Sequence, residues 1–443
     1  MTLRFGTDGV RGVANVDLTP ELVLALGRAA ARVLPGKRFV IGRDTRRSGP
    51  MLETALAAGL ASEGVVVERL GVLPTPAVAW VSATDDIPAA MISASHNPYA
   101  DNGVKFFAAG GRKLGDEVEE ELEAELDRLL HAEVSDANGV GEIADRSGVI
   151  EGYVDFLLGT VGSLEGLRVV VDCANGAAFD VAPEALRRAG VDVDVLAAAP
   201  DGVNINEACG STHPESLQRR VIEIGADVGL ALDGDADRVV AVDHRGRLVD
   251  GDHLIAICAR DMAERGTLCG NTVVVTVMTN LGFRLAMVEH GIEVAETAVG
   301  DRYVLEALVA GSFSLGGEQS GHVIFHDIAT TGDGTLTGLQ LLDVVKRSGC
   351  TLADLADEAM TQLPQVLHNV RIAGDAAGVV AALADEVQAV EAELGDHGRV
   401  LLRPSGTEPL VRVIVEAPTA EQADAAALRL VAAVERAAST AAT

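Results

Sequence analysis

Three stretches of the chain share one pattern of hydrophobic and polar positions. In each, a short apolar run is followed by a polar or glycine-bearing loop, a helical stretch and a second apolar run. The stretches cover residues 39–70, 168–196 and 272–299. A glycine stands where each helix should stop, at Gly64, Gly190 and Gly291. The pattern predicts three strand-helix-strand units, and helices between strands are typical of α/β layers.

The last part of the chain has a different pattern. A helical stretch at residues 379–394 is followed by a pair of strands within residues 399–417 and by another helical stretch at residues 421–438. This order predicts a smaller α+β domain at the C-terminal end. With boundaries near Gly152, Gly251 and Leu367, we expect four domains. Their expected bounds are residues 1–152, 153–251, 252–367 and 368–443.

Size and charge narrow the class of protein. The chain has 443 residues, of which 48% are hydrophobic, so it is globular and too long for one ordinary core. The formal net charge of −31 argues against nucleic acid or an anionic membrane as a general partner. An anionic substrate would need basic residues concentrated where it binds. Lysine occurs at only four positions, and Lys105 follows closely after Ser95.

Cysteine usage and hydropathy point to a cytoplasmic protein. The five cysteines are odd in number and contain no Cys-x-x-Cys pair, so we expect reduced thiols that bind no metal. The N-terminus lacks an apolar signal core. No run of about 18 apolar residues occurs, which predicts the absence of a membrane span.

The stretch ISASHNP, residues 92–98, places two serines and a histidine directly after an apolar run. Its Asn-Pro step favours a turn, and the proline restricts the residue before it, so Ser95 and His96 should be held on a rigid loop. A hydroxyl presented in this way can cap a turn or take part in chemistry. The residues of this stretch alone leave both interpretations open.

The stretch LALDGDADRVVAVD carries the most specific signal. An apolar run at residues 228–232 predicts a strand that leads into Asp233, Asp235 and Asp237. Alternate residues of an extended chain project to one side, so we expect the three carboxylates to converge. A hard divalent cation would relieve their repulsion, and ligands that are all oxygen atoms favour Mg²⁺ or Ca²⁺.

The aspartate stretch has two other interpretations. An EF-hand loop is excluded, because its sixth position would be Arg238 where glycine is needed and its twelfth would be His244 where glutamate is expected. A solvated acidic turn remains the alternative to a metal site, since Asp-Gly-Asp is also ordinary turn chemistry.

The stretch RPSGTEP, residues 403–409, suits a phosphate group. Small residues let backbone N–H groups approach an anion, and the hydroxyls of Ser405 and Thr407 add donors. The guanidinium groups of Arg403 and Arg412 can bind phosphate through two hydrogen bonds each. A plain Ser-Gly-Thr turn is the alternative.

The stretch GGEQSGH, residues 316–322, combines glycines with Glu318, Gln319, Ser320 and His322. Donors and acceptors without bulk suit the hydroxyl groups of a sugar, but the signal is weak when taken singly. In open α/β sheets, ligands bind beyond the carboxyl ends of the strands, where all of these polar loops lie. We therefore expect the loops to meet in one cleft.

Two further polar stretches are equally weak signals. GTDGVRG covers residues 6–12 and GRDTR covers residues 42–46. Both are compatible with plain turns that are held by salt bridges.

In the identity and order of these motifs, the chain resembles the α-D-phosphohexomutase family over essentially its whole length. ISASHNP is similar to the family's phosphoserine loop, DGDADR to its metal loop, GEQSGH to its sugar-recognition loop and RPSGTEP to its phosphate-binding loop. The resemblance implies three similar α/β domains with mixed sheets sandwiched by helices, plus a smaller C-terminal α+β domain, around a central cleft. Ala236 departs from the family's common form DGDGDR, which puts the flexibility of that loop in question.

The resemblance also implies a reaction. Gln319 and the opening RFGTDGVRG are most similar to bacterial members that interconvert glucosamine 6-phosphate and glucosamine 1-phosphate through a phosphoserine enzyme and a 1,6-bisphosphate. Those members feed the synthesis of UDP-N-acetylglucosamine and cell-wall precursors. Members acting on mannose or glucose phosphates are the alternative, and they tend to carry methionine in place of Gln319. A metal-dependent phosphatase that uses Ser95 and a non-catalytic sugar-phosphate binding protein are the rivals from other classes.

The resemblance assigns roles to individual residues. Ser95 would carry the phosphoryl group and would coordinate one Mg²⁺ per subunit together with Asp233, Asp235 and Asp237. The candidates for moving the hydroxyl proton are Lys105 and His322. The residues expected to balance charge around the phosphoserine are Arg11, His96 and Arg238.

Substrate contacts follow from the other two loops. Glu318 and Ser320 would hold sugar hydroxyls, and His213 and Arg302 are weaker candidates for contact. The residues expected to hold the phosphate that does not react are Arg403, Ser405, Gly406, Thr407 and Arg412. A hexosamine or hexose 1,6-bisphosphate is the expected activator, and a homodimer is an assembly compatible with the family.

Overall fold

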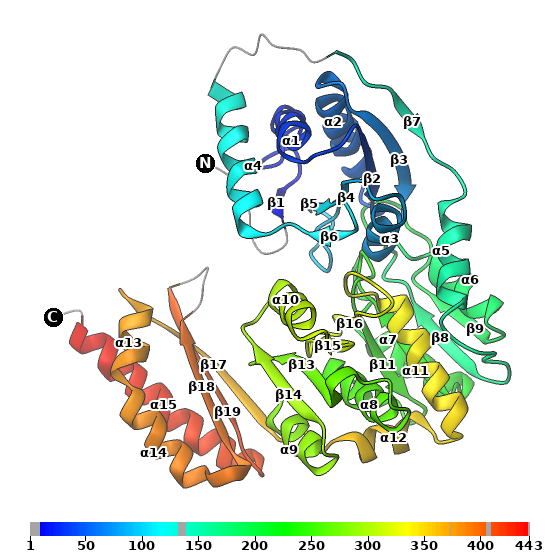
Figure 1. Cartoon of the computed structure of the whole chain (residues 1–443). Coiled ribbons are helices and arrows are strands. Elements are labelled where there is room, and N and C mark those ends of the chain that lie inside the picture. The colour runs from blue at the N-terminus through cyan, green and yellow to red at the C-terminus, as the bar shows by residue number, and fades with distance from the viewer. Residues whose placement is uncertain (1–8, 132–138, 373, 405–408, 442–443) are drawn as a thin grey trace. The chain divides into compact units, whose positions relative to one another are not determined.

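The computed structural model describes residues 9–131, 139–372, 374–404 and 409–441. The chain divides into two compact units. Unit 1 comprises Met1–Met278 and Ile292–Ala359, and unit 2 comprises Thr279–Gly291 and Met360–Thr443. The described residues of unit 1 form three sheets covered by helices, and those of unit 2 form one small sheet (Figure 1).

The first sheet has the strand order β1-β5-β4-β2-β3-β7, with β6 paired to β5. Its strands are β1 (Val10–Val13), β2 (Arg38–Arg43), β3 (Val66–Val72), β4 (Ala89–Ile92), β5 (Asp101–Ala108), β6 (Arg112–Lys113) and β7 (Ile143–Asp145). Its helices are α1 (Pro20–Val33), α2 (Gly49–Ser62), α3 (Thr75–Asp85) and α4 (Asp116–His131). The pairs β2–β3, β2–β4 and β3–β7 are parallel and the pairs of β5 with β1, β4 and β6 are antiparallel, so this sheet is mixed.

Helices cover both faces of the first sheet (Figure 1). Leu52, Leu56 and Leu60 recur every four residues along α2 and share one buried cluster with apolar side chains of α1, α4 and the strands. Phe39 and Ile41 of β2 face this cluster. The opposite face of β2 meets α3 so closely that a Cβ added at Gly42 would lie 2.3 Å from a methyl of Val78. Alternate residues of β2 are therefore buried against different helices.

The second sheet has the order β12-β11-β10-β8-β9, and the third has the order β14-β13-β15-β16. The strands of the second sheet are β8 (Arg168–Asp172), β9 (Asp192–Leu196), β10 (Val228–Leu232), β11 (Val239–Asp243) and β12 (Leu248–Val249). Those of the third are β13 (Thr272–Thr276), β14 (Glu293–Thr297), β15 (Leu315–Gly317) and β16 (Val323–Phe325). Both sheets join parallel to antiparallel pairs and are therefore mixed, as expected.

The remaining helices of unit 1 accompany the second and third sheets. They are α5 (Val149–Leu158), α6 (Val181–Arg188), α7 (Glu215–Ile224), α8 (Gly251–Glu264), α10 (Asp301–Gly311), α11 (Gly334–Ser348) and α12 (Leu352–Ala359), with a 3₁₀ turn at Cys269–Asn271. Alternation between strand and helix is the feature that the apolar pattern predicted.

The three predicted strand-helix-strand units are confirmed as β2-α2-β3, β8-α6-β9 and β13-α9-β14, where α9 is Leu281–Glu289. Gly64, Gly190 and Gly291 follow the three helices with φ values of +85°, +95° and +66°. Glycine adopts this left-handed backbone without a Cβ clash, and this explains why each helix ends there. The helix α9 groups with unit 2, although its flanking strands belong to unit 1.

Unit 2 contains the antiparallel sheet β17-β19-β18. Its strands are β17 (Gln365–Arg371), β18 (Arg399–Pro404) and β19 (Leu410–Glu416), and its other helices are α13 (Ala376–Ala382), α14 (Ala384–Leu394) and α15 (Ala420–Ala441), with a 3₁₀ turn at Gly395–His397. The single helix expected at residues 379–394 is wrong, because the chain breaks at Leu383. The break brings Val379, Leu383 and Val390 into one core with β18 and β19.

Two of the three expected domain boundaries fall inside elements, and one falls at an element end. The boundary near Gly152 lies inside α5, that near Gly251 lies at the first residue of α8, and that near Leu367 lies inside β17. Unit 2 resumes at Met360, before β17 begins. A C-terminal domain that includes all of β17 is therefore the more compact division.

Two chemical expectations concern the whole chain. In the part of the chain that the structure describes, no helix combines the length and the apolar character that crossing a membrane requires. All five cysteines are free thiols, and Cys173, Cys209 and Cys258 are buried. Burial raises the pKa of Cys258 to about 12, so this thiol is unreactive near neutral pH.

An aromatic cluster connects the first sheet to α11. Trp80 of α3 lies with its ring centroid 5.8 Å from that of Tyr153 on α5. The hydroxyl of Tyr153 donates to Asp333, which caps α11 by accepting from the N–H of Leu336 at 2.9 Å. The N–H of Gly334, the first residue of α11, donates to the carbonyl of Ala236 at 2.9 Å. The start of α11 therefore supports the loop that carries Asp233, Asp235 and Asp237, here called the aspartate loop.

The cap of α11 predicts a pH dependence of stability. Burial raises the pKa of Asp333 to about 6, against about 4 in an unfolded chain. Between these values the folded state binds the proton more tightly, so the free energy of unfolding should fall as pH rises from about 4 to about 6. Asp333→Asn keeps a capping oxygen but cannot titrate, and it should remove on the order of 3 kcal/mol of this pH dependence. Chemical denaturation at several pH values, compared between parent and variant, measures the difference. Identical slopes would contradict the assignment.

Candidate active site

The predicted polar loops of unit 1 follow the ends of strands. Ser95 lies three residues after β4, the aspartate loop follows β10 directly, and residues 318–322 form the turn between β15 and β16. β4 and β10 run parallel to their neighbours β2 and β8, so both loops leave the carboxyl edge of a parallel pair. The structure brings these three loops together within unit 1.

The loop at Ser95 is held on both sides by hydrogen bonds to its backbone. Ser95 has φ of +52°, a left-handed conformation that costs a residue with a Cβ about 1 to 2 kcal/mol. Its N–H donates to the Oγ of Ser93 at 3.0 Å. Its carbonyl accepts from Arg46 at 3.2 Å and from Asn206 of the second domain at 2.9 Å. Hydrogen bonds to the N–H and the carbonyl of Ser95 therefore hold its left-handed backbone in place.

A buried ion pair lies beneath this loop. Arg46 and Asp44, both 0% exposed, pair with each other inside the GRDTR stretch. Asp44 also accepts from the hydroxyl of Ser93 at 2.6 Å, while Arg46 donates to the carbonyl of Asn97 at 2.6 Å. Burial raises the pKa of Asp44 and the Arg46 guanidinium opposes that rise. The stretch is thus more than the plain turn that its sequence allowed, because it supports the backbone around Ser95.

The aspartate loop is a turn, and the expectation of an extended chain is wrong. Residues 234–237 are turn and bend, and Ala236 has φ of +56°. The turn still brings the three carboxylates together, since one ligand oxygen of each of Asp233, Asp235 and Asp237 lies within 4.8 Å of the others. The left-handed position explains why glycine is common at Ala236 in the family that the motif resembles.

The electrostatics of this trio are unusual. All three aspartates are at most 3% exposed. Burial raises the pKa of Asp233 well above its usual range, and the neighbouring carboxylates of Asp237 and Asp235 raise it further. Burial acts in the same direction on Asp237, but Lys105, His322 and Arg238 hold the pKa of that carboxyl well below its usual range. The protein alone therefore balances the three charges only in part.

The trio fits a hard divalent cation. Asp235 Oδ1 and Asp237 Oδ1 are buried and have no hydrogen-bond partner among the described residues. A buried carboxylate oxygen without a partner costs about 1 to 3 kcal/mol or more, which a cation would recover. Ligands that are all oxygen atoms suit Mg²⁺ or Ca²⁺, as expected from the sequence.

Ser95 and Lys105 meet this trio from the first sheet. The Oγ of Ser95, which is 1% exposed, donates to Asp233 Oδ2 at 2.5 Å. The Nζ of Lys105 lies 2.8 Å from Asp235 Oδ2 and 3.5 Å from Asp237 Oδ2. The hydroxyl, the lysine and the carboxylates therefore form one cluster across two sheets.

His322 joins the cluster from the third sheet. Its Nδ1 lies 3.7 Å from Asp237 Oδ2, and its Nε2 accepts from the N–H of Gly332 at 3.2 Å. Burial would lower the pKa of His322, but the carboxylates of Asp237 and Asp301 raise it overall. The turn at residues 318–322 is thereby connected to the aspartate loop.

Glu318 and Ser320 lie on the same turn as His322. Glu318 is half-buried and accepts from the N–H of Gly300 at 3.1 Å, while Ser320 is exposed. Gln319 uses its carbonyl to accept from the N–H of Gly251 at 3.0 Å. The structure thus places both predicted sugar contacts beside the cluster, and their roles remain predictions.

The residues expected to balance charge around Ser95 are also near it. His96 Nδ1 lies 3.3 Å from the Ser95 Oγ and 3.4 Å from Arg238 Nη1. Burial, followed by the guanidinium groups of Arg238 and Arg11, lowers the pKa of His96. Its ring is therefore neutral at neutral pH, and the positive charge here comes from the two arginines.

The two weaker candidates have other surroundings. Arg302, which is 6% exposed, forms ion pairs with Asp116 and Glu119 of α4, the latter at 2.6 Å. His213 lines a pocket together with His96 and Asn206. Arg302 thus ties α10 to α4, and His213 lies beside the Ser95 loop.

Unit 2 carries the arginines of the predicted phosphate loop. Arg403 of β18 and Arg412 of β19 stand directly opposite in the antiparallel ladder. Like charges in such a pair are destabilising. Burial, followed by the charge of Arg412, lowers the pKa of Arg403. The Nε atoms of both have no partner among the described residues, which suits a pair arranged for an anion. Ser405, Gly406 and Thr407 lie outside the described residues.

Sequence reasoning missed several residues of this site. Asp44, Arg46 and Asn206 hold the Ser95 loop, and Thr75 of α3 donates to Asp235 at 2.6 Å. The GRDTR stretch was a signal for the first two. For Thr75, the signal was its position between two prolines directly after an apolar strand.

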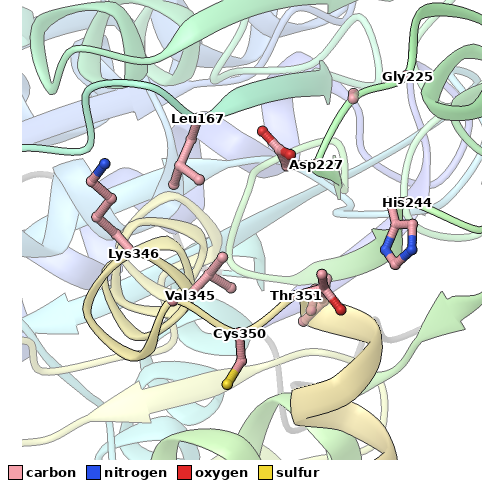
Figure 2. A pocket seen from close by; sticks show the side chains of 11 residues that line it. Leu167, Gly225, Asp227, His244, Val345, Lys346, Cys350 and Thr351 are labelled. Atoms are coloured by element: carbon pink, nitrogen blue, oxygen red, sulfur yellow. The ribbon is translucent and has the colours of Figure 1, made fainter.

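A separate pocket lies away from these residues. Its lining includes Leu167, Asp227, His244, Val345 and Cys350 (Figure 2). Lys346 also lines the pocket, and its side chain donates to the carbonyl of Glu165 at 2.6 Å. No residue predicted for the active site lines this pocket, so we assign it no part in the chemistry.

Comparison with protein families gives matches along the chain. Four family descriptions match in order, those of the phosphoglucomutase/phosphomannomutase α/β/α domains I, II and III and of the C-terminal domain. They cover residues 2–132, 151–246, 250–363 and 352–433.

Individual proteins match over the full length. A protein from Thermobifida fusca named phosphoglucosamine mutase is 57% identical over 442 residues, covering 97% of each chain. A crystal structure of a phosphoglucomutase/phosphomannomutase family protein from Burkholderia thailandensis has a TM-score of 0.83 at 24% identity and covers 97% of each chain. The structure of N-acetylphosphoglucosamine mutase from Aspergillus fumigatus, in complex with GlcNAc-6P and magnesium, has a TM-score of 0.68 at 19% identity, covering 99% of this chain and 96% of that one. The two structures establish the likeness of the fold.

The ion pair beneath Ser95 predicts a large effect on stability. Arg46→Gln leaves Asp44 buried without its charge partner, so the free energy of unfolding should fall by about 3 to 5 kcal/mol. Arg38→Gln is the control, because Arg38 is 46% exposed in its pair with Glu68 and its loss should cost less than about 1 kcal/mol. Urea denaturation of both variants and the parent measures the difference. Equal losses in the two variants would show that the buried pair has no special role.

Proposed function

Because the chain belongs to the phosphoglucomutase/phosphomannomutase family, with all four domain descriptions matching in order, we propose that it interconverts glucosamine 6-phosphate and glucosamine 1-phosphate. The match to four domains confirms the predicted fold class and the resemblance seen in the motifs. One observation carries the proposal: the Ser95 hydroxyl lies 2.5 Å from Asp233 inside a buried trio of carboxylates. The full-length relative from T. fusca, named phosphoglucosamine mutase, supports the choice of sugar.

The proposed reaction moves one phosphoryl group out and another back. In its active form, Ser95 carries a phosphoryl group on Oγ. The Oγ–P bond breaks as a bond forms between phosphorus and O1 of glucosamine 6-phosphate, and the O1 proton leaves to a base. The resulting 1,6-bisphosphate turns over in the site and returns its 6-phosphoryl group to Ser95. The O6 atom regains a proton, and glucosamine 1-phosphate is released.

The residues of the cluster have separate tasks in this scheme. Arg46, Ser93 and Asn206 hold the backbone of Ser95 so that its oxygen faces the carboxylate trio. Asp233, Asp235 and Asp237 would hold Mg²⁺, which when bound supplies positive charge against the oxygens of the transferred group. We assign movement of the sugar hydroxyl proton to Lys105 and His322, which lie beside the trio.

The remaining residues bind the substrate and balance its charge. Arg11 and Arg238 would offset the phosphoserine, with a neutral His96 in contact with its Oγ. Glu318 and Ser320 would hold hydroxyls common to both orientations of the sugar. The opposed arginines Arg403 and Arg412, together with Ser405, Gly406 and Thr407, would bind the phosphate that does not react.

The source of the phosphate on Ser95 and the location of the protein are also part of the proposal. A hexosamine or hexose 1,6-bisphosphate would phosphorylate Ser95 initially, because such a molecule is the reaction's own intermediate. Free thiols support a cytoplasmic location, where the product would feed amino-sugar and cell-wall precursor synthesis. The division into four domains and a homodimeric assembly stay predictions.

A mutase on glucose or mannose phosphates is the second candidate, since the matched family is described by both activities. We expect kcat/KM for glucosamine 6-phosphate to exceed that for glucose 6-phosphate and mannose 6-phosphate by at least about tenfold. The three substrates are assayed side by side with the purified chain. A larger kcat/KM for either hexose 6-phosphate would contradict the glucosamine assignment, and steady release of inorganic phosphate without isomerised sugar would indicate a phosphatase.

Phosphorylation of Ser95 is the second test. Intact-mass spectrometry after incubation with glucose 1,6-bisphosphate should show one added phosphate that maps to Ser95. Ser95→Ala should gain no phosphate, and its turnover should fall on the order of 10³-fold or more, the scale for loss of a covalent nucleophile. Its free energy of unfolding should stay within about 3 kcal/mol of the parent, because the change removes the hydroxyl's hydrogen bonds to Asp233 and His96 and no other contact of the loop backbone. A phosphate on another residue, or an active Ser95→Ala, would contradict the mechanism.

A further inference from the structure

We propose that Thr75 is a positioning residue for the cation site. Its hydroxyl and its main-chain N–H orient Asp235 so that one carboxylate oxygen is kept for the metal. This inference rests on the metal site of the proposed function and extends it to a residue on another domain. Thr75 has its backbone in the first α/β domain, whereas Asp235 follows β10 in the second.

The position of Thr75 is rigid. It is the first residue of α3, it is 1% exposed, and it stands between Pro74 and Pro76. Pro74 has φ of −60° and ψ of 148°, which is the extended geometry of a helix cap. The two proline rings restrict the backbone on both sides of Thr75. Its side chain and its N–H are therefore presented in one direction.

Two hydrogen bonds join Thr75 to Asp235. The Oγ1 of Thr75 donates to Asp235 Oδ2 at 2.6 Å. The N–H of Thr75 donates to the carbonyl oxygen of Asp235 at 2.9 Å. The first N–H groups of a helix have no partner within the helix, and this one is used to fix the aspartate backbone. The helix start also places the positive end of its dipole toward the acidic loop.

These bonds give the two carboxylate oxygens of Asp235 different surroundings. Asp235 Oδ2 accepts from Thr75 and from Lys105, whose Nζ lies at 2.8 Å. Asp235 Oδ1 is buried and has no hydrogen-bond partner among the residues the structure describes. The oxygen without a donor is the one available to a cation. Hydrogen-bond partners of ligating carboxylates typically change metal affinity by 10- to 100-fold.

A purely structural role for Thr75 predicts a different outcome. The chain supplies a matched control in Thr45, whose Oγ1 donates to the carbonyl of Asn175 at 2.6 Å. That bond also links the first domain to the second, but it ends on a backbone oxygen outside the aspartate trio. A general loss of domain packing should therefore affect Thr45→Val and Thr75→Val alike, whereas an effect on the cation should be confined to Thr75.

The experiment measures Mg²⁺ binding to the full-length, metal-free chain by isothermal titration calorimetry. Thr75→Val keeps the shape and removes the donor, and its Kd for Mg²⁺ should rise by about 10- to 100-fold. Thr75→Ser restores the hydroxyl and should bind Mg²⁺ close to the parent. Thr45→Val should match the parent, and Asp235→Asn should lose binding. Thermal unfolding in chelator verifies that each variant is folded at the assay temperature.

The outcomes separate this inference from the proposed function. If the parent binds Mg²⁺ and Thr75→Val binds it equally well, Thr75 has no positioning role and the metal site stands. If Thr45→Val weakens binding as much as Thr75→Val does, the effect is one of domain packing and the inference is overturned. A parent that binds no Mg²⁺ overturns the metal site itself and this inference with it. If Thr75→Val is unfolded at the assay temperature, Thr75→Ala gives the same test without a branched methyl group.

Discussion

Repulsion among three buried carboxylates is the constraint on which the rest of this site depends. A single turn after β10 brings Asp233, Asp235 and Asp237 within 4.8 Å of one another with almost no exposure to water. Three neighbouring groups each offset part of that repulsion. They are the hydroxyl of Ser95, the ammonium of Lys105 and the imidazole of His322. These partners come from different domains, so the charges that burial makes costly also specify how the α/β domains of unit 1 meet.

The same constraint explains why the supporting residues are buried and polar. Ser95 and Ala236, one in each of two loops of the cluster, both have a left-handed backbone, and neither conformation is favourable alone. The Ser95 loop is held by Arg46 and Asn206, and the aspartate loop is held at Ala236 by the N-terminus of α11. Strain at the reactive positions is thus offset by hydrogen bonds from neighbouring domains. A site assembled in this way is precise only while its domains are docked.

The sequence could predict the elements and the candidate residues that the structure brings together, and it could not predict what holds them. Periodicity and glycine positions located β2-α2-β3 and its two counterparts, because local apolar patterns and helix stops are encoded within a few residues. Motif spacing located Ser95 and the aspartates. The hydrogen bonds made by Arg46 and Thr75 could not be predicted, because they join residues far apart in the sequence. Arg46 donates to a carbonyl 49 residues away, and Thr75 donates to an aspartate 160 residues away. Spacing along the chain carries no record of such contacts, and the break at Leu383 likewise depends on tertiary packing.

The net charge of −31 poses a problem for a protein proposed to bind phosphosugars, and distance resolves it. At physiological ionic strength, charges separated by more than about 8 Å of solvent are largely screened, so distant surface carboxylates contribute little to a ligand. Charges in contact dominate, and the groups around Ser95 are Arg11, Arg238 and Lys105. In unit 2, Arg403 and Arg412 lie opposite each other, and a bound anion would offset the repulsion between their charges. The chain has only four lysines, and one of them lies beside the aspartates. Positive charge is therefore concentrated at the proposed ligand contacts, where it can outweigh an acidic surface.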